Sequence, residues 1–347
     1  MDVLSSLLGS QKQKFIYTSE TSCLLATVTK GKKSTLSLSD LEELPNNPFK
    51  ENAYFDAPIL KKITKSKNAI CVVAPLSRFI YKAKLEAKTK SKGIQGLIPL
   101  LKERFNADLK TNQIAAIDAY TGIEIRDSAN TVLPDHVCFI GTQKQEIKMI
   151  QSELMGCQCI PKKLLLTTLT TTKGLMDYVK LVKVTQPVLF IDFSINQSLV
   201  FVLCNNHLEA AYPPVHGLKS LISLTRKACS LPDDVSTYKY LLQSVTEDAQ
   251  VMETITQRMC ADIKSYIDFF EVQTSLPIEL LFINGLSPQL AWLTQCISKV
   301  LEIKPLQIDF DAWLQAHKGN TQSNEKTTQI SQPLWIGMLS AIFNYFR

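Results

Sequence analysis

Residues 188–206 read Val188-Leu189-Phe190-Ile191-Asp192-Phe193-Ser194-Ile195-Asn196-Gln197-Ser198-Leu199-Val200-Phe201-Val202-Leu203-Cys204-Asn205-Asn206. An apolar, β-branched run ends in an acid and polar residues, and a second apolar run follows. This pattern predicts a β-hairpin whose turn carries the carboxylate of Asp192 at the edge of a buried sheet. The Asn205-Asn206 pair can adopt the left-handed backbone that a return strand needs.

A second stretch near the start of the chain repeats this pattern. Residues 14–29 form an apolar run, the polar turn Thr18-Ser19-Glu20, and another apolar run, followed by Lys30-Gly31-Lys32-Lys33. Two copies of one strand-turn-strand pattern predict an internally duplicated fold. The first copy matches the second in shape only.

The length and composition are those of a globular chain. Its 347 residues leave room for two or more domains, and 45% of them are hydrophobic. The sequence holds no uninterrupted apolar segment of about 18 residues, so a membrane span is not expected. The N-terminus has no basic segment before its short apolar stretch, so we expect no signal peptide and a cytoplasmic location.

The cysteine and histidine residues do not form a metal motif. Nine cysteines are present, and most lie inside apolar runs, where a reduced thiol packs as a small hydrophobe. Cys157-Gln158-Cys159 is the closest pair, without the two-residue spacing of a zinc knuckle. The four histidines have no partner at an informative spacing. We expect core cysteines, no metal and no histidine chemistry.

The net charge of +6 comes from lysines that cluster at 30–33, 61–67 and 82–92. Such clusters can meet an acidic partner or an anionic membrane surface, and they can equally be solvated side chains on exposed strands and linkers. A nucleic-acid reader usually adds stacking aromatics or a recognisable module. Neither is visible in the sequence, so no nucleic-acid partner is expected.

The remaining elements follow from apolar spacing. Residues 76–163 read as strand, helix, strand, strand, helix, with the last helix at 144–156, and they resemble an inserted α/β block. Residues 164–182 read as a helix that leads into the hairpin. One long helix is expected at 246–273, a buried strand at 278–283 ending in Asn284-Gly285, and a last apolar helix at 333–345. That last helix is expected to pack into the first domain rather than lie on a lipid surface.

The order of these features resembles the PilM family of type IV pilus assembly, which has an actin-like fold related to FtsA. The resemblance covers roughly residues 10–347 and rests on several weak signals in order: the hairpin, Gly217, the Phe269-Phe270 pair, Asn284-Gly285, and Ile336 to Ala341. It implies an α/β, bilobed actin-like (ASKHA) fold with two duplicated ribonuclease-H-like domains and an inserted small α/β subdomain. The expected division is 1–75, 164–187 and 333–347 for the first domain, 76–163 for the insert, and 188–332 for the second domain.

The resemblance also implies where a nucleotide would bind. Carried onto this sequence, the family's cleft residues are Thr18, Ser19, Asp192, Ser194, Gly217, Lys239, Asn284 and Gly285. Several of the family's features are absent here. The first turn has no Asp or Gly and carries Glu20, which would repel a triphosphate. The second turn continues with Phe193-Ser194 in place of glycine.

Two further contacts of the family are weakened. Gly285-Leu286 stands for a Gly-Gly pair, and only Lys239 is left of the base-binding helix motif. The sequence therefore favours a degenerate cleft, with no cofactor or weakly bound ATP and Mg²⁺, and no hydrolysis.

The resulting hypothesis is a non-enzymatic scaffold, or pseudo-ATPase, of a type IV pilus or type II secretion platform at the inner face of the inner membrane. The resemblance implies that it binds the cytoplasmic N-terminal peptide of a PilN-like membrane protein, with a motor ATPase as a possible second partner. Two alternatives stay open, because one fold hosts many functions. They are an ATP-binding actin-like or FtsA-like cell-division protein, and a small-molecule kinase of the same superfold.

Overall fold

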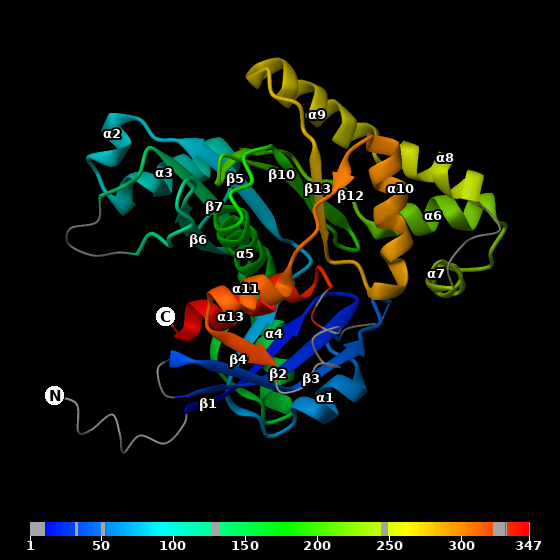
Figure 1. The fold of residues 1–347 in the computed structure, drawn as a ribbon, viewed down its shortest axis with the longest axis horizontal. Coiled ribbons are helices and arrows are strands. Elements are labelled where there is room, and N and C mark those ends of the chain that lie inside the picture. Colours follow the sequence, from blue (N-terminus) through cyan, green and yellow to red (C-terminus); the bar gives the residue numbers. More distant parts are fainter. Residues whose placement is uncertain are drawn as a thin grey trace. The chain divides into compact units, whose positions relative to one another are not determined.

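The computed structural model describes residues 11–31, 34–49, 53–126, 132–243, 249–321, 330 and 332–346 (Figure 1). The chain packs into two compact units. The first unit contains residues 1–74, 149–181 and 307–347, and the second contains 75–148 and 182–306. The three-part division expected from the sequence is a finer one and stays a prediction.

The first unit is built on a six-stranded sheet in the order β15-β3-β2-β1-β4-β8. These strands are β1 (Gln11–Thr18), β2 (Ser22–Lys30), β3 (Leu36–Pro45), β4 (Lys67–Val73), β8 (Ile160–Leu166) and β15 (Gly319–Thr321). β1, β2 and β3 form an antiparallel meander, whereas β4 runs parallel to β1 and β8 runs parallel to β4. The helices of this unit are α1 (Ala57–Ile63), the second half of α4 (Lys144–Gly156), α5 (Thr167–Leu181), α11 (Phe310–Ala316) and α13 (Trp335–Phe346).

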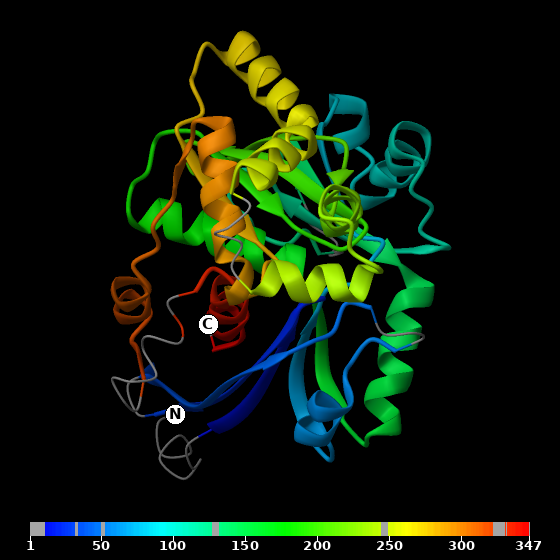
Figure 2. The same ribbon diagram turned by 90° about the vertical axis from the view of Figure 1, so that its right-hand side faces the viewer.

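The last helix is part of the core of the first unit. α13 packs against α5, β1 and β2, and Figure 2 shows it in red beside the blue strands. The two helices can approach closely because Gly174 has no side chain. A Cβ at this position would lie 2.9 Å from the backbone oxygen of Ile336. Trp335 of α13 is completely buried. The expectation that this apolar helix packs into the protein is confirmed.

The second unit contains a sheet with the path β11-β10-β9-β13-β14, and β12 also pairs with β10. Its strands are β9 (Val188–Asp192), β10 (Gln197–Cys204), β11 (His207–Ala211), β12 (Val215–His216), β13 (Leu280–Asn284) and β14 (Lys304–Pro305). Again three strands form an antiparallel meander, and two further strands continue it in parallel. The strand order therefore repeats that of the first unit, and the predicted duplication is confirmed.

Helices line this second sheet. They are α6 (Leu218–Ala228), α7 (Asp234–Leu242), α8 (Ala249–Met259), α9 (Ala261–Thr274), the 3₁₀ turn η2 (Pro288–Leu290) and α10 (Ala291–Leu301). α8 packs between α6 and α10 (Figure 1). The Asn205-Asn206 turn has φ of 49° and 67°, so the left-handed geometry expected from the sequence is confirmed.

The same unit includes a three-stranded antiparallel sheet in the order β5-β7-β6, made of β5 (Phe79–Lys84), β6 (Asn112–Asp118) and β7 (His136–Gln143). The short α2 (Ala87–Lys90), α3 (Ile94–Phe105) and the start of α4 complete it. Leu97 and Leu101 of α3 pack on Val137 and Phe139 of β7 in a separate apolar cluster. The three strands and the two longer helices follow the order predicted for this block, and α2 is an additional short helix before α3.

Two sequence-based expectations were wrong. Residues 160–166, partly assigned to a helix, form β8, because parallel pairing with β4 outweighs the helical spacing of the leucines. The single helix expected at 246–273 is two helices that separate at the buried Cys260, whose φ of −88° and ψ of 0° leave the helical region. The first three residues of the expected helix, 246–248, lie outside the described residues.

Candidate functional site

The turn after β9 is organised around the carboxylate of Asp192. This residue ends β9 and is completely buried. β13 lies parallel to β9 and aligns Asn284 with Asp192, so the carboxyl ends of the two strands meet. The side-chain amide of Asn284 donates a hydrogen bond to Asp192 Oδ1 at 2.8 Å. The two residues that the sequence placed in one cleft are therefore in direct contact.

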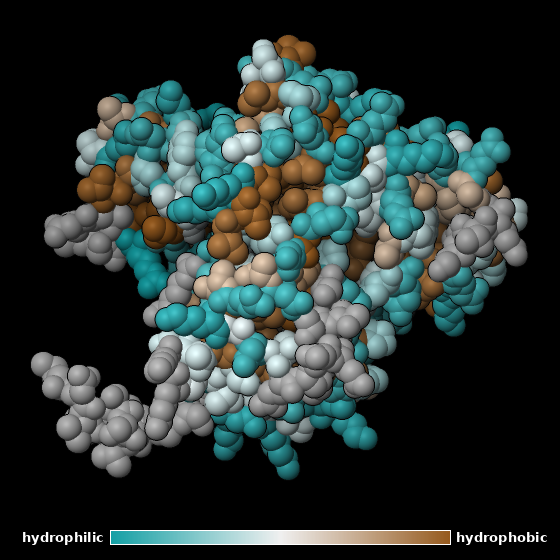
Figure 3. All heavy atoms as spheres, in the orientation of Figure 1, coloured by the Kyte–Doolittle hydropathy of each residue, from teal (hydrophilic) through white to brown (hydrophobic). Residues whose placement is uncertain are grey.

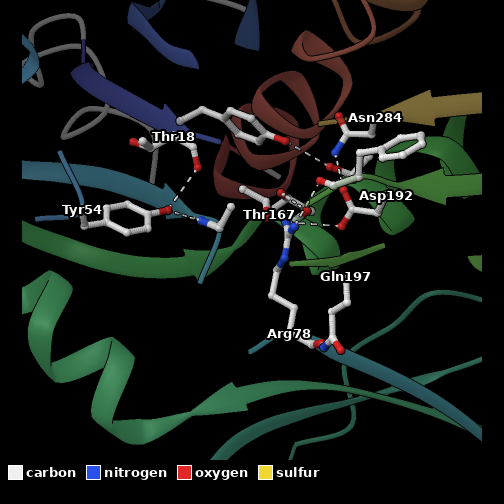
Figure 4. Close-up of polar contacts among 12 residues, drawn as sticks. Thr18, Tyr54, Arg78, Thr167, Asp192, Gln197 and Asn284 are labelled. Atoms are coloured by element: carbon white, nitrogen blue, oxygen red, sulfur yellow. Dashed lines mark hydrogen bonds and ion pairs between the residues drawn. The ribbon is translucent and has the colours of Figure 1, made fainter. Parts of the chain in front are cut away.

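Arg78 is the cation that pairs with this carboxylate (Figure 4). It immediately precedes β5, and its Nη1 lies 3.5 Å from Asp192 Oδ2. Its Nη2 donates a hydrogen bond to the backbone oxygen of Phe193 at 3.2 Å. The arginine and aspartate side chains are 4% and 0% exposed. A buried carboxylate needs such a partner, since the cost of desolvating an unpaired charge is several kcal/mol.

The backbone of Arg78 is also held at this turn. Gln197, the first residue of β10, donates a hydrogen bond from Nε2 to the backbone oxygen of Arg78 at 3.3 Å. Figure 4 shows the Arg78 and Gln197 side chains on the same side of the turn, with the guanidinium directed at Asp192. Both ends of Arg78 are therefore fixed by the β9–β10 hairpin.

Two predicted glycines fit closely against this turn. A Cβ on Gly217 would lie 2.4 Å from the backbone oxygen of Ser194, which accepts a hydrogen bond from the Leu218 N–H. Gly285 has φ of +87°, and a Cβ there would lie 2.3 Å from the backbone oxygen of Phe193. Both positions require glycine because the turn backbone occupies the space of a side chain.

The turn also contains two buried polar atoms whose hydrogen-bonding capacity is not used within the described residues. They are Ser194 Oγ and Asn284 Oδ1. Both residues are 2% exposed. Five of the eight predicted cleft residues therefore lie at one turn inside the second unit. They are Asp192, Ser194, Gly217, Asn284 and Gly285.

Lys239 does not join that cluster. It is exposed on α7, and within the described residues no hydrogen bond or ion pair connects it to the turn. Its neighbour Tyr238 is buried, and burial raises the pKa of the Tyr238 hydroxyl to about 12 although a hydrogen bond with Ser287 opposes the shift. The buried side of α7 therefore presents a tyrosine rather than the predicted lysine.

The corresponding turn of the first unit, residues 18–22, contains Thr18 and Ser19. The Ser19 N–H donates to the backbone oxygen of Ser22 at 2.8 Å. Ser19 Oγ accepts hydrogen bonds from the N–H groups of Ser22 at 2.9 Å and Thr21 at 3.3 Å. Three backbone N–H groups of this turn therefore have partners inside the turn itself.

Neighbouring residues hold the same turn from outside. Asn46 donates from Nδ2 to the backbone oxygen of Ser19 at 3.0 Å. The Tyr54 hydroxyl donates to the backbone oxygen of Thr18 at 3.4 Å, a contact visible in Figure 4. Thr18 is completely buried, and its hydroxyl points at Cys23 Sγ, 3.8 Å away. Hydroxyl, amide and backbone groups thus hold the first turn closed.

Arg78 was missed by the sequence reasoning. One signal was available, because Arg78 is the only arginine in the lysine-rich stretch between residues 61 and 92. Arginine rather than lysine is preferred in buried ion pairs, since its guanidinium is weakly hydrated and donates several hydrogen bonds in one plane. The sequence does not indicate that Asp192, more than a hundred residues away, is its partner.

The described residues contain no cluster of three or more His, Cys, Asp and Glu side chains arranged to hold a metal ion. None of their helices has both the length and the apolar character required to cross a membrane. All nine cysteines are free thiols, and six of them are buried.

Comparison with known proteins identifies the fold. Neither a family model nor a curated protein sequence matches the chain. Among solved structures, the PilM–PilN type IV pilus biogenesis complex matches with a TM-score of 0.66 at 12% identity, covering 95% of this chain and 98% of the other. The chain therefore has an actin-like fold, the one found in PilM.

Weaker likenesses extend to other structures. A Bacteroides thetaiotaomicron protein described as having an actin-like ATPase fold matches with a TM-score of 0.42 at 10% identity, covering 91% of this chain and 98% of the other. The cytoplasmic domain of EpsL, an inner-membrane component of the Vibrio cholerae type II secretion system, matches with a TM-score of 0.35 at 8% identity, covering 64% and 78%. Likenesses this weak support no conclusion on function.

Proposed function

We propose that this protein is a PilM-like scaffold of a type IV pilus or type II secretion assembly platform, and that it does not hydrolyse ATP. The observation that carries the second half of this proposal is the buried Arg78–Asp192 pair. The first half is supported by a fold match to PilM that covers 95% of this chain. The actin-like fold itself is compatible with ATPases, kinases and scaffolds, so the proposal depends on the site.

We infer that the residues present do not fit a magnesium nucleotide. A nucleotide phosphate needs backbone N–H groups that can approach it, and Mg²⁺ needs carboxylate oxygens that are open to it. Asp192 is already paired with Arg78 and hydrogen-bonded to Asn284. In the first turn, the N–H groups of Ser19 and Ser22 are donated within the turn. Each turn would have to break its own contacts to receive the ligand.

Weak nucleotide binding is the alternative that a specific observation favours. Ser194 Oγ and Asn284 Oδ1 are buried atoms whose hydrogen bonds are not made within the described residues. Buried polar groups of this kind are uncommon in native proteins, and a ligand or ordered water usually satisfies them. A bound molecule that contacts Ser194 and Asn284 while leaving the ion pair intact would satisfy both.

Titration calorimetry with ATP and Mg²⁺ tests the proposal. The expected result is no heat of binding up to about 1 mM nucleotide, which corresponds to a binding free energy weaker than about 4 kcal/mol. Micromolar binding that is lost in Asp192→Ala but kept in Asp234→Ala, a control at an ion pair with Arg226, would overturn the degenerate cleft. Release of phosphate by the wild-type protein would overturn the non-enzymatic assignment.

The partner follows from the same proposal. We infer that the protein binds the cytoplasmic N-terminal peptide of a PilN-like membrane protein, and that it is held at the inner face of the inner membrane through such partners, with a motor ATPase as a second partner. The solved complex that supports this contains PilM together with PilN. Peptide recognition on actin-like folds would use strand edges and apolar pockets.

A binding assay tests the partner. Synthetic peptides copying the short cytoplasmic tails of single-span membrane proteins encoded beside this gene are labelled and titrated with the full chain. Saturable binding of one tail, absent for a scrambled peptide of the same composition, is expected. Absence of binding to every such tail would remove the PilN-like partner from the proposal and leave the question of hydrolysis unchanged.

A further inference from the structure

The second unit contains a cavity of about 960 Å³ beside the Arg78–Asp192 pair, with Arg78 itself in the lining. Its volume is at the upper end of the range of about 300–1,000 Å³ found for ligand sites. Its lining comes from β5 and the two residues before it, the end of α3 with part of the loop 106–112, and the end of β7 with the start of α4. Gln197 and Pro214 complete the lining. Every lining residue belongs to the second unit.

One wall of the cavity is a stack of three aromatic rings. The ring of Tyr81 lies parallel to that of Phe105, with centroids 4.5 Å apart and 5° between planes. Phe79 stacks on the other side of Tyr81 at 5.0 Å. The Phe79 ring lies over Gly141, its partner on β7. Glycine leaves the space for this ring, since a Cβ at residue 141 would be 2.5 Å from it. These contacts hold the aromatic wall in place.

The charge of the lining has one sign. Lys110, Lys144, Lys148 and Arg78 line the cavity, and the lining residues in the described part of the chain include no Asp or Glu. The acids nearest in sequence are used by the backbone: Glu146 accepts from the Ser77 N–H and Asp108 from the Lys110 N–H. Arg78 is committed to Asp192, and the other cations of the lining are the three lysines.

The start of α4 fixes one of these lysines. The Lys144 N–H donates to the backbone oxygen of Thr111 at 2.8 Å, and its Nζ donates to that of Leu109 at 2.6 Å. Gln143 is held by a hydrogen bond from its N–H to Ser77 Oγ at 3.1 Å. The loop, the strand start and the helix start are therefore tied together around the cavity.

We propose that this cavity binds an acidic, extended peptide segment of a partner protein, with an apolar side chain on the aromatic wall and carboxylates beside Lys110, Lys144 and Lys148. Side-chain amides complete the lining and can both donate to and accept from a peptide backbone. They belong to Asn106, Asn112, Gln143, Gln145 and Gln197. This inference goes beyond the proposed function, since it concerns a site within one unit and requires no membrane protein.

A peptide fits better than single-stranded nucleic acid, which is the other anionic polymer that aromatic sites bind. Nucleic-acid sites present free aromatic faces on which bases stack. Here both faces of Tyr81 are covered by Phe79 and Phe105, so the central ring offers no face to a base. Charge complementarity and apolar contact remain, and both suit an acidic peptide.

The test uses the full chain and a fluorescein-labelled twelve-residue peptide in which Asp and Glu alternate with Phe, Leu and Ser. The matched probe has Lys in place of every acid. Fluorescence anisotropy compares the wild type with Lys110→Glu/Lys148→Glu and with Lys88→Glu/Lys102→Glu, which makes the same charge change at exposed residues that do not line this cavity. Thermal unfolding confirms that each variant is folded.

The acidic peptide is expected to bind the wild type, to lose affinity about tenfold or more in the cavity variant, and to change by about threefold or less in the control. Phe105→Leu, which keeps an apolar side chain but removes a ring from the stack, is expected to weaken binding several-fold. Equal losses in the two charge variants, equal binding of the lysine peptide, or tighter binding of a dT12 oligonucleotide than of the acidic peptide would overturn the proposal.

Discussion

The β1–β2 turn and the β9–β10 turn occupy the same position in two sheets of the same strand order, yet their interiors are built differently. The first turn is closed by hydroxyl and backbone groups around Ser19. The second is closed by an ion pair between Asp192 and Arg78, a residue from outside the hairpin. The two sheets therefore share one strand order, whereas the polar chemistry of the two turns differs.

This difference has an energetic consequence. Hydrogen bonds between neutral groups contribute about 0.5–1.5 kcal/mol each, and a turn that loses one keeps the others. A buried ion pair is weak evidence for net stability, but removing one partner leaves an uncompensated charge and costs about 3–5 kcal/mol. The second turn should consequently be the more sensitive of the two to single substitutions.

The largest effect is expected for Arg78→Ala. It leaves the completely buried Asp192 carboxylate without its cation, and the free energy of unfolding should fall by about 3–5 kcal/mol. Urea denaturation followed by circular dichroism measures the loss. Arg226→Ala removes a partner from the half-exposed pair with Asp234 and should cost about 1 kcal/mol or less. Similar losses in the two variants would mean that Asp192 does not depend on Arg78.

A double variant sharpens this prediction. Arg78→Ala leaves the buried Asp192 charge without its cation, and adding Asp192→Asn removes that charge. Asn284 can still donate a hydrogen bond to the new amide oxygen. The double variant should therefore be more stable than Arg78→Ala alone, with a coupling energy of about 1–3 kcal/mol. Additive losses would exclude a direct interaction of the two side chains.

Gly285→Ala should have the next largest effect. The backbone φ of +87° is unfavourable for a side chain, and the new Cβ would lie 2.3 Å from the backbone oxygen of Phe193. We expect a loss of about 2–3 kcal/mol in unfolding free energy. The control is Gly156→Ala at the end of α4, where a Cβ meets nothing within 4 Å. A neutral result at Gly285 would show that the β9–β10 turn can move away from it.

Ser19→Ala tests the first turn. It removes the oxygen that accepts from the Ser22 and Thr21 N–H groups, and a cost of about 1–2 kcal/mol is expected because those N–H groups are buried. Ser265→Ala, at an exposed position of α9, serves as the control and should be close to neutral. A larger loss at Ser19 than at Arg78 would reverse the comparison between the turns.

Local sequence signals were sufficient for elements whose residues determine their own structure. The helix predicted at 144–156 has those bounds, and Asn205 and Asn206 adopt the left-handed turn. The Phe269-Phe270 pair shows the limit of such signals. Phe270 is 2% exposed, whereas Phe269 is 54% exposed with Val272 and Leu276 near the end of α9, where Figure 3 shows apolar spheres at the top of the molecule. Adjacent residues on a helix face different directions, so the pair alone did not identify the buried ring.

Long-range partners were the part that the sequence could not supply. β8 is a strand because it pairs with β4. In the sequence, the whole inserted sheet lies between these two strands. The Asp192–Asn284 contact was anticipated through the family resemblance, whereas Arg78 was not, since it follows from the packing of the inserted sheet on the β9–β10 hairpin within the second unit. Whether the eight predicted cleft residues bind a nucleotide stays a prediction.

The smallest expected effect concerns Glu43 of β3, whose Oε1 accepts a hydrogen bond from Ser22 Oγ at 3.0 Å at the end of the first turn. Burial raises the pKa of the Glu43 carboxyl, although the Ser22 hydrogen bond opposes the shift. A carboxyl whose pKa is higher in the folded state binds its proton more tightly when the protein is folded. At neutral pH, where the carboxyl is charged, it therefore lowers the stability of the folded state. This penalty disappears as the pH falls below the ordinary glutamate range. Glu43→Gln should therefore be slightly more stable than the wild type at pH 7 and lose that advantage near pH 4. Urea denaturation midpoints of the wild type and Glu43→Gln at the two pH values measure this difference in stability. Glu103→Gln, at an exposed position, is the control. A stability gain that is the same at both pH values would mean that the first turn gains nothing from protonation of Glu43.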